Sequence, residues 1–190
     1  MTTPVLASTN LTVSCIGAGR LGTTLCRLFL EQQSDIRISI GQVLNNSLQS
    51  SLKALDFIGD GTAAENPQSL KPADLWLIST PDDTIQEASE ALAQSGILTP
   101  GNIVFHCSGS LSSKIIHLPD NRCYRASVHP THSFADPTRS VSTFPGSSCA
   151  VEGDKQAAQV LNRLFSAIGG KCIPLQSDKK GLYHAATVMA

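Results

Sequence analysis

Three glycines near the start of the chain have the type and spacing that bind a nucleotide phosphate. Gly17 can make a tight turn, Gly19 lets the backbone approach a pyrophosphate, and Gly22 permits close packing of a helix on a strand. The free N–H groups at the start of that helix would face the anion. The alternative is a glycine turn that serves only helix–strand packing. The cofactor-binding residues expected in this run are Gly17, Ala18, Gly19, Arg20, Leu21 and Gly22.

The end of the second expected strand bears on which dinucleotide binds. An NAD site usually has Asp or Glu there, where the carboxylate accepts hydrogen bonds from the ribose 2′-hydroxyl. No acidic residue occurs between positions 36 and 55, and Asn45, Asn46 and Ser47 could donate hydrogen bonds to a 2′-phosphate. The sequence therefore favours NADP. NAD is the alternative, because the arginine that often binds a 2′-phosphate is absent from this position.

Two further strand ends carry hydroxyl groups that could reach the nucleotide. Ser79, Thr80 and Pro81 end one expected strand, and Ser108 ends the next. Both ends would lie at the carboxyl edge of a parallel sheet, where nucleotides bind. The alternative interpretations are strand termination followed by helix capping at residues 79–81, and a tight turn at Ser108.

Hydride chemistry on a carbonyl or an imine also needs a proton donor and a polar group that orients the substrate. Lys180 and His184 are suitable types, and their spacing places both side chains on one helical face. His129, at a strand end, could line the substrate pocket. The alternatives are a solvated Lys180, a packed or capping His184, and a His129 that bonds only to its loop. Tyr183 is expected in the core. His129 and His132 lack a carboxylate or cysteine at ligand spacing, so no metal site is predicted.

These side chains must be positioned by alternating strands and helices. Apolar runs predict buried strands at residues 11–16, 35–40, 73–79, 102–107, 124–129, 147–151 and 171–175. Helical periodicity follows several of them, most clearly from Ala157 to Ile168. Asp82 and Asp83 are expected to cap a helix, with Asp83 and Gln86 resembling a capping box.

Two connections are also predicted. A helical stretch is expected after Ser108, and a Pro- and Ser-rich loop of about 15 residues runs from position 130 to position 145.

The alternation predicts an α/β fold with a doubly wound, mainly parallel sheet. A helix from residue 179 has no stop signal before residue 190. We therefore expect a nucleotide-binding domain over residues 1–176, followed at residues 177–190 by the start of an all-helical second domain that would continue in a longer chain.

Composition argues against several partners. A formal net charge of −1 without a clustered Lys/Arg face disfavours nucleic acid and anionic membranes. No apolar run approaches the about 20 residues that cross a bilayer, and the first four residues lack the features of a secretory signal. A cytoplasmic location is expected. Six dispersed cysteines predict neither a disulfide framework nor a zinc site.

Six short motifs together resemble one family; they lie at residues 17–22, 77–83, 106–109, 127–130, 133–136 and 182–186. They are similar to motifs of the Rossmann-like NADP oxidoreductases with a C-terminal domain of unknown function, in the 6-phosphogluconate dehydrogenase-like superfamily. The resemblance spans nearly the whole chain. It implies an NADP-preferring oxidoreductase that transfers hydride to or from a small polar substrate, in a cleft between the nucleotide domain and a helical domain. That helical domain would also form a homodimer.

The resemblance also bears on the catalytic residues. Related dehydrogenases carry Lys and Asn one turn apart on the interdomain helix, and here Lys180 and His184 have this spacing. The departure at His184 implies that the proton donor can differ. Two alternative functions remain open at this point: a dinucleotide-binding sensor or regulatory module without turnover, and an enzyme that transfers electrons between NADP and a deazaflavin.

Overall fold

The structure is a computed structural model that describes residues 10–119 and 122–188. The first four residues, on which the secretory-signal prediction depends, lie outside the described residues, as do the last two residues of the expected C-terminal helix. Within the described ranges, every helix is too short or too polar to cross a membrane.

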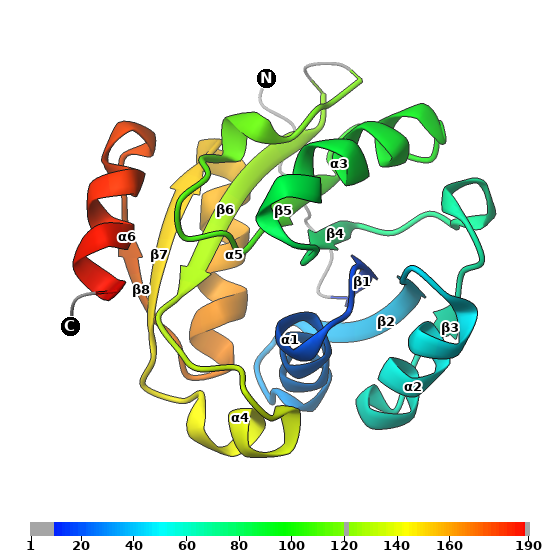
Figure 1. The fold of residues 1–190 in the computed structure, drawn as a ribbon, viewed down its shortest axis with the longest axis horizontal. Helices are drawn as coiled ribbons and strands as arrows, with labels where there is room; N and C mark the ends of the chain where they lie inside the picture. Colours follow the sequence, from blue (N-terminus) through cyan, green and yellow to red (C-terminus); the bar gives the residue numbers. More distant parts are fainter. Residues whose placement is uncertain (1–9, 120–121, 189–190) are drawn as a thin grey trace.

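The described residues form one sheet with the strand order β3-β2-β1-β4-β5-β6-β7-β8 (Figure 1). The strands are β1 (Asn10–Ile16), β2 (Arg37–Leu44), β3 (Thr62–Ala63), β4 (Leu75–Ile78), β5 (Ile103–His106), β6 (Tyr124–Pro130), β7 (Ser148–Gly153) and β8 (Lys171–Pro174). Neighbouring strands are parallel except β6 and β7, which are antiparallel. The predicted doubly wound, mainly parallel sheet is confirmed.

Helices cover both faces of the sheet because its central strands are apolar on both sides. Along β4, Leu75 and Leu77 pack into one apolar cluster, and Trp76 packs into the other. The first cluster includes Phe29 and Phe165, whose rings meet edge to face at 5.3 Å. The helices are α1 (Arg20–Glu31), α2 (Leu48–Ile58), α3 (Ile85–Gln94), α4 (Pro137–Thr143), α5 (Lys155–Ala167) and α6 (Lys180–Val188).

Two predicted connections differ in the structure. The helical stretch expected after Ser108 is only a single 3₁₀ turn, η3 (Ser113–Ile115). The expected loop from residue 130 to residue 145 contains the helix α4. A proline at its start and the Asp136 side chain, which accepts a hydrogen bond from the Arg139 N–H at 2.8 Å, allow this short helix to begin.

The expected capping by Asp82 and Asp83 is wrong. These residues lie in the 3₁₀ turn η2 (Asp82–Thr84), which follows Pro81, and α3 begins after Thr84. No side chain of the described residues caps either segment. The Asp82 carboxylate instead accepts hydrogen bonds from two serine hydroxyls in the loop after β5.

Candidate nucleotide and substrate site

The loop between β1 and α1 is a glycine turn at the carboxyl edge of the sheet. Gly17 has a φ of +82°, and a Cβ there would lie 2.7 Å from the Thr80 nitrogen. The Gly17 N–H donates to the Leu44 carbonyl at 2.8 Å. At Gly19, an added Cβ would meet only the Gly17 carbonyl oxygen, at 4.0 Å. The turn therefore joins the ends of β1, β2 and β4, while the Cβ side of Gly19 is open among the described residues.

Gly22 allows α1 to pack directly on the end of β4. A Cβ at this position would overlap the Ser79 hydroxyl and lie 3.1 Å from the Cys15 sulfur. The Ser79 hydroxyl donates to the Gly17 carbonyl at 2.8 Å. Ser79 therefore supports the glycine turn through this hydrogen bond, which already uses its hydroxyl hydrogen.

The remaining residues of the turn differ in exposure. Ala18 is buried and Leu21 is partly buried, whereas Arg20 is exposed and donates from Nη1 to the Ala135 carbonyl at 3.4 Å. Gly19 is the N-cap of α1, and in the part of the chain that the structure describes no side chain caps the start of this helix. Thr80 is partly exposed and Pro81 is exposed beside the turn.

The segment after β2 lies against the glycine turn. The Asn45 amide donates from Nδ2 to the Ala18 carbonyl at 3.4 Å. The Ser47 hydroxyl accepts from the Ser50 N–H at 3.2 Å and so caps α2. Asn46 is exposed. Three residues are predicted to bind a 2′-phosphate. Ser47 caps α2, and of the other two, Asn46 is more exposed than Asn45.

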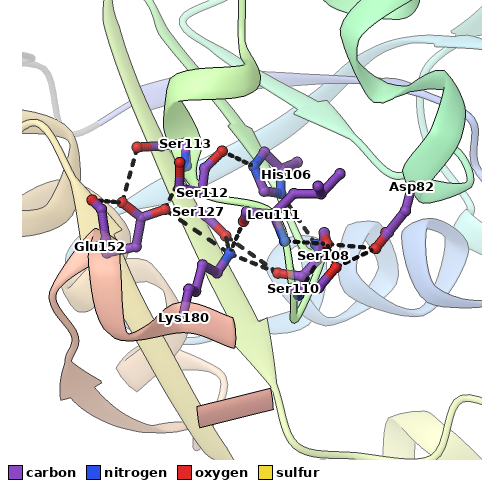
Figure 2. Close-up of polar contacts among 11 residues, drawn as sticks. Asp82, His106, Ser108, Ser110, Leu111, Ser112, Ser113, Ser127, Glu152 and Lys180 are labelled. Carbon is purple, nitrogen blue, oxygen red and sulfur yellow. Dashed lines mark hydrogen bonds and ion pairs between the residues drawn. The ribbon is translucent and has the colours of Figure 1, made fainter. Parts of the chain in front are cut away.

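A second polar loop follows β5 and is held by Asp82 (Figure 2). The Asp82 carboxylate accepts hydrogen bonds from the Ser108 hydroxyl at 2.7 Å and the Ser110 hydroxyl at 3.0 Å. The Ser108 hydroxyl also accepts from the Leu111 N–H at 3.0 Å. Asp82 thus ties the end of β4 to the loop at residues 108–111, a role that sequence reasoning missed.

Lys180 is buried beneath this loop, so a solvated Lys180 is wrong. Its ammonium group donates to the Ser108 carbonyl at 2.7 Å, to the Leu111 carbonyl and to the Ser127 hydroxyl (Figure 2). An ammonium group has three N–H bonds, and all three have protein acceptors here. Burial lowers the pKa of Lys180 to about 8, against the opposing effect of the Glu152 carboxylate.

Glu152 is a buried carboxylate in β7 that sequence reasoning also missed. It accepts hydrogen bonds from the Ser113 hydroxyl at 3.0 Å and the Ser177 hydroxyl at 2.6 Å. The Ser113 N–H donates to the same carboxylate. One signal was available in the sequence, because Glu152 is a charged residue next to the apolar run of β7. Ser177 belongs to the 3₁₀ turn η4 (Ser177–Lys179), which leads into α6.

His106 is fully buried at the end of β5 and has a defined tautomer. Its Nδ1 accepts from the Ser108 N–H at 3.2 Å, so its Nε2 carries the proton and donates to the Ser112 carbonyl at 3.2 Å. Burial, followed by the Lys180 charge, lowers the pKa of His106 to about 4. The ring is therefore neutral at pH 7 and braces the same loop.

His129 and His184 meet beside Gly109. Their rings lie 5.6 Å apart, edge to face. A Cβ at Gly109 would overlap His184 Nδ1 and lie 2.8 Å from His129 Nε2. Within the described part of the chain, Nδ1 of each ring is buried without a hydrogen-bond partner. Burial, followed by the charges of Lys180 and His184, lowers the pKa of His129 to about 4.

Tyr183 is not a core residue, so that prediction is wrong. Its side chain is only partly buried, and its hydroxyl shares a hydrogen bond of 2.9 Å with the Thr131 hydroxyl. Its ring meets the His129 ring edge to face at 5.8 Å. The structure therefore brings together His129, Tyr183, His184 and Lys180 beside the loop after β5. No cluster of three or more metal-ligating side chains occurs in residues 10–119 and 122–188.

Comparison with protein families finds matches over two regions of the chain. Residues 2–130 match the Rossmann-like domain family. The chain belongs to the Rossmann-like domain family. Residues 147–190 of this Rossmann-like chain match a domain of unknown function, DUF2520. A search of the curated proteins found no match.

Several solved structures share the Rossmann-like fold. Protein TM1727 from Thermotoga maritima is 28% identical, with a TM-score of 0.70 over 93% of this chain and 62% of that one. Protein BF3122 from Bacteroides fragilis is 19% identical, with a TM-score of 0.78 over 95% and 66%. Prephenate dehydrogenase from Aquifex aeolicus, in complex with hydroxyphenyl propionate and NAD+, is 17% identical, with a TM-score of 0.69 over 90% and 61%. The chain spans less than two thirds of the length of each of these proteins.

Proposed function

We propose that this chain is the nucleotide-binding part of an NAD(P)-dependent oxidoreductase that prefers NADP and acts on a small polar substrate. The observation that carries the proposal is the glycine turn. Gly17 and Gly22 occupy positions where a side chain would collide with the end of β4, and Gly19 opens the uncapped start of α1. A helix start of this kind binds phosphate through its free N–H groups.

The residues around the turn fit a bound dinucleotide. Residues 17–22 would hold the pyrophosphate, and Thr80, Pro81 and Ser108 lie along the same carboxyl edge. NADP(H), when bound, supplies the hydride donor or acceptor. Ser79 would act through the turn that its hydroxyl supports.

The preference for NADP is supported by the segment after β2. This segment lacks a carboxylate between residues 36 and 55, and such a carboxylate would repel a 2′-phosphate. Asn45 already contacts the turn at Ala18, and the exposed Asn46 follows it. Both amides can donate hydrogen bonds to phosphate oxygens.

The chain's own groups also suggest how a proton is handled. Lys180 uses its three N–H bonds on Ser108, Leu111 and Ser127, so in this arrangement it positions the loop and has no donor left for a substrate. Among the described residues, the buried Nδ1 atoms of His129 and His184 lack a hydrogen-bond partner beside the same loop. Because its pKa is lowered to about 4, His129 is neutral at pH 7, and its unprotonated ring nitrogen can accept a hydrogen bond from a substrate hydroxyl. We therefore assign proton transfer to the two histidines and positioning to Lys180.

An activity assay should use a protein that includes the expected helical domain, because the substrate cleft is expected to lie between the two domains. Nicotinamide oxidation would be followed with a panel of 2-oxo acids and imines. His129→Asn and His184→Asn are expected to lower kcat about a hundredfold, the usual range for a lost acid–base group, with the Kd for NADPH nearly unchanged. Full activity in both variants would overturn the assignment, and tight NADPH binding without turnover of any substrate would favour the sensor function.

A further inference from the structure

Two cysteines outside the nucleotide site lie directly opposite each other on neighbouring strands. Cys149 of β7 and Cys172 of β8 are register partners in a parallel pair. Neighbouring strands lie about 4.8 Å apart, which falls within the Cα separation of about 4.4–6.8 Å found in disulfides. Register partners also point to the same face of the sheet. The backbone therefore places the two thiols side by side.

The surroundings of the two thiols differ. Cys149 is fully buried, and a Cβ at Gly170 would lie only 2.9 Å from its sulfur. Cys172 is partly exposed on β8, the last strand in the sheet order. The Ser166 hydroxyl of α5 donates to the Cys172 sulfur at 3.8 Å. Cys172 is therefore the more exposed residue of the pair, and Cys149 is the buried one.

The more exposed cysteine of the pair has the lower pKa. The hydrogen bond with Cys149 lowers the pKa of Cys172 to about 7, with the Ser166 hydroxyl adding to the effect and burial opposing it. The same hydrogen bond and burial raise the pKa of Cys149. The thiolate is the reactive form of cysteine.

We propose that Cys149 and Cys172 form a thiol-oxidation site for a peroxide-class oxidant, with Cys172 as the attacking thiol and Cys149 as the resolving thiol. The proposal is independent of the proposed oxidoreductase function, because neither residue lies in the glycine turn or beside Gly109.

The peroxide would oxidise the two thiols to a disulfide in two steps. The Cys172 thiolate attacks one peroxide oxygen, so that an S–O bond forms, the O–O bond breaks, and the leaving hydroxide takes a proton to become water. The Cys149 sulfur then attacks the sulfenic sulfur of Cys172, so that the S–S bond forms and the S–O bond breaks. The proton of Cys149 leaves with that oxygen as the second water. The two thiols lose two electrons and the peroxide gains them.

The strand arrangement allows the bond to close and gives it a structural consequence. A disulfide needs a Cβ separation of about 3.5–4.5 Å, which is shorter than the spacing between strands. Among the described strands, β8 pairs with β7 alone, so no second neighbour prevents it from shifting toward β7. β8 leads through η4 into α6, and the Ser177 hydroxyl of η4 donates to Glu152. Oxidation would therefore fix the strand that precedes the helix carrying Lys180 and His184.

The experiment uses the whole chain and hydrogen peroxide, followed by peptide mass spectrometry without reduction. We expect a peptide pair that joins Cys149 to Cys172 and has lost two hydrogens. The buried Cys15, Cys26 and Cys107 are internal controls and should remain free thiols. Oxidation of Cys172 only to sulfinic acid, or equal oxidation of all the cysteines, would overturn the proposal.

Two further measurements separate the roles of the thiols. Iodoacetamide should modify Cys172 with a half-maximal rate near pH 7, and an alkaline profile typical of a free thiol would contradict the attacking role. In Cys149→Ser, peroxide should leave a sulfenic acid on Cys172 that a cyclic diketone probe traps. In Cys172→Ser, Cys149 should stay reduced. Circular dichroism would confirm that both variants are folded, and disulfide formation in the wild type remains decisive if either is not.

Discussion

Lys180 Nζ lies 3.9 Å from Glu152 Oε1, and the side chain of each residue is 1% exposed. Figure 2 shows that this buried ion pair is surrounded by hydroxyl and carbonyl groups from several strand ends and loops. Lys180 is the first residue of α6, so the pair fastens the start of that helix to β7 and to the loop after β5. The pair therefore fixes where His184, one turn later, meets Gly109.

Removal of the Lys180 charge should destabilise the chain strongly. Lys180→Met leaves the Glu152 carboxylate buried without its cation, which typically costs about 3–5 kcal/mol. The free energy of unfolding would be measured by urea denaturation. Lys179→Met is the matched control, because Lys179 is exposed and its pair with Asp178 at 3.6 Å should contribute less than about 1 kcal/mol.

A double variant of Lys180 and Glu152 tests whether the two side chains interact. Glu152→Gln keeps acceptor and donor groups near Ser113 and Ser177, and in the double variant with Lys180→Met no charge is left unpaired. The double variant should therefore be more stable than the sum of the two single losses predicts, by about 1–3 kcal/mol. Strict additivity would show that the two side chains do not interact.

Lowering the pH should reduce the free energy of unfolding, because His106 is buried in its neutral form. Its pKa is about 4 in the folded chain and 6.5 ordinarily, so between these values the unfolded chain binds a proton that the folded chain does not. The stabilisation is present above pH 6.5 and is lost as the pH falls toward 4. Between pH 7.5 and pH 5 the loss is about 2 kcal/mol. Denaturation curves of the wild type and His106→Asn would be compared, and an equal pH dependence in both would contradict the assignment. The exposed His117 gives the control, His117→Asn.

Gly22 should be required for both the turn and nucleotide binding. In Gly22→Ala, the new Cβ displaces the Ser79 hydroxyl, which then loses its hydrogen bond to the Gly17 carbonyl. Loss of one such bond costs about 1 kcal/mol, and a distorted turn adds to this, so the Kd for NADPH should rise about tenfold. Gly181→Ala is the control, because an added Cβ there meets no atom within 4 Å. An unchanged Kd in Gly22→Ala would remove the turn from the binding site.

Asn46 should influence the choice of cofactor. Asn46→Asp adds a carboxylate after β2 that repels a 2′-phosphate but can accept hydrogen bonds from a 2′-hydroxyl. The Kd for NADPH should rise about tenfold, equivalent to about 1.4 kcal/mol, while the Kd for NADH stays the same or falls. Asn46→Ala separates lost hydrogen bonding from repulsion. If Asn46→Asp weakened both cofactors equally, the residue would not face the 2′ position.

The fold and the glycine turn could be predicted because their signals are local. Buried parallel strands appear as short apolar runs, as in residues 73–79, and the turn needs glycine at positions 17, 19 and 22. The polar network could not be predicted in the same way. Asp82 and Ser108 are 26 residues apart, and Lys180 and Ser108 are 72 apart, so these contacts depend on which strands become neighbours.

Rules that consider only neighbouring residues in the sequence predicted the wrong roles for Asp82 and Lys180, because tertiary contacts outweighed them. Asp82 follows a proline at a helix start, where capping is common, but two serine hydroxyls of the next strand end bind its carboxylate instead. A lysine in the first turn of a helix is usually solvated, yet Lys180 is buried and donates hydrogen bonds to three acceptors. The order of strands β4, β5, β6 and β7 decides both outcomes.

The most direct test of the nucleotide site is a fluorescence titration of the chain with NADPH and, separately, with NADH. We expect saturable binding of NADPH that is tighter than binding of NADH and is weakened in Gly22→Ala. Equal affinity for the two nucleotides would contradict the NADP preference. Failure of both to bind would contradict the central claim that the glycine turn at residues 17–22 of this chain holds a dinucleotide.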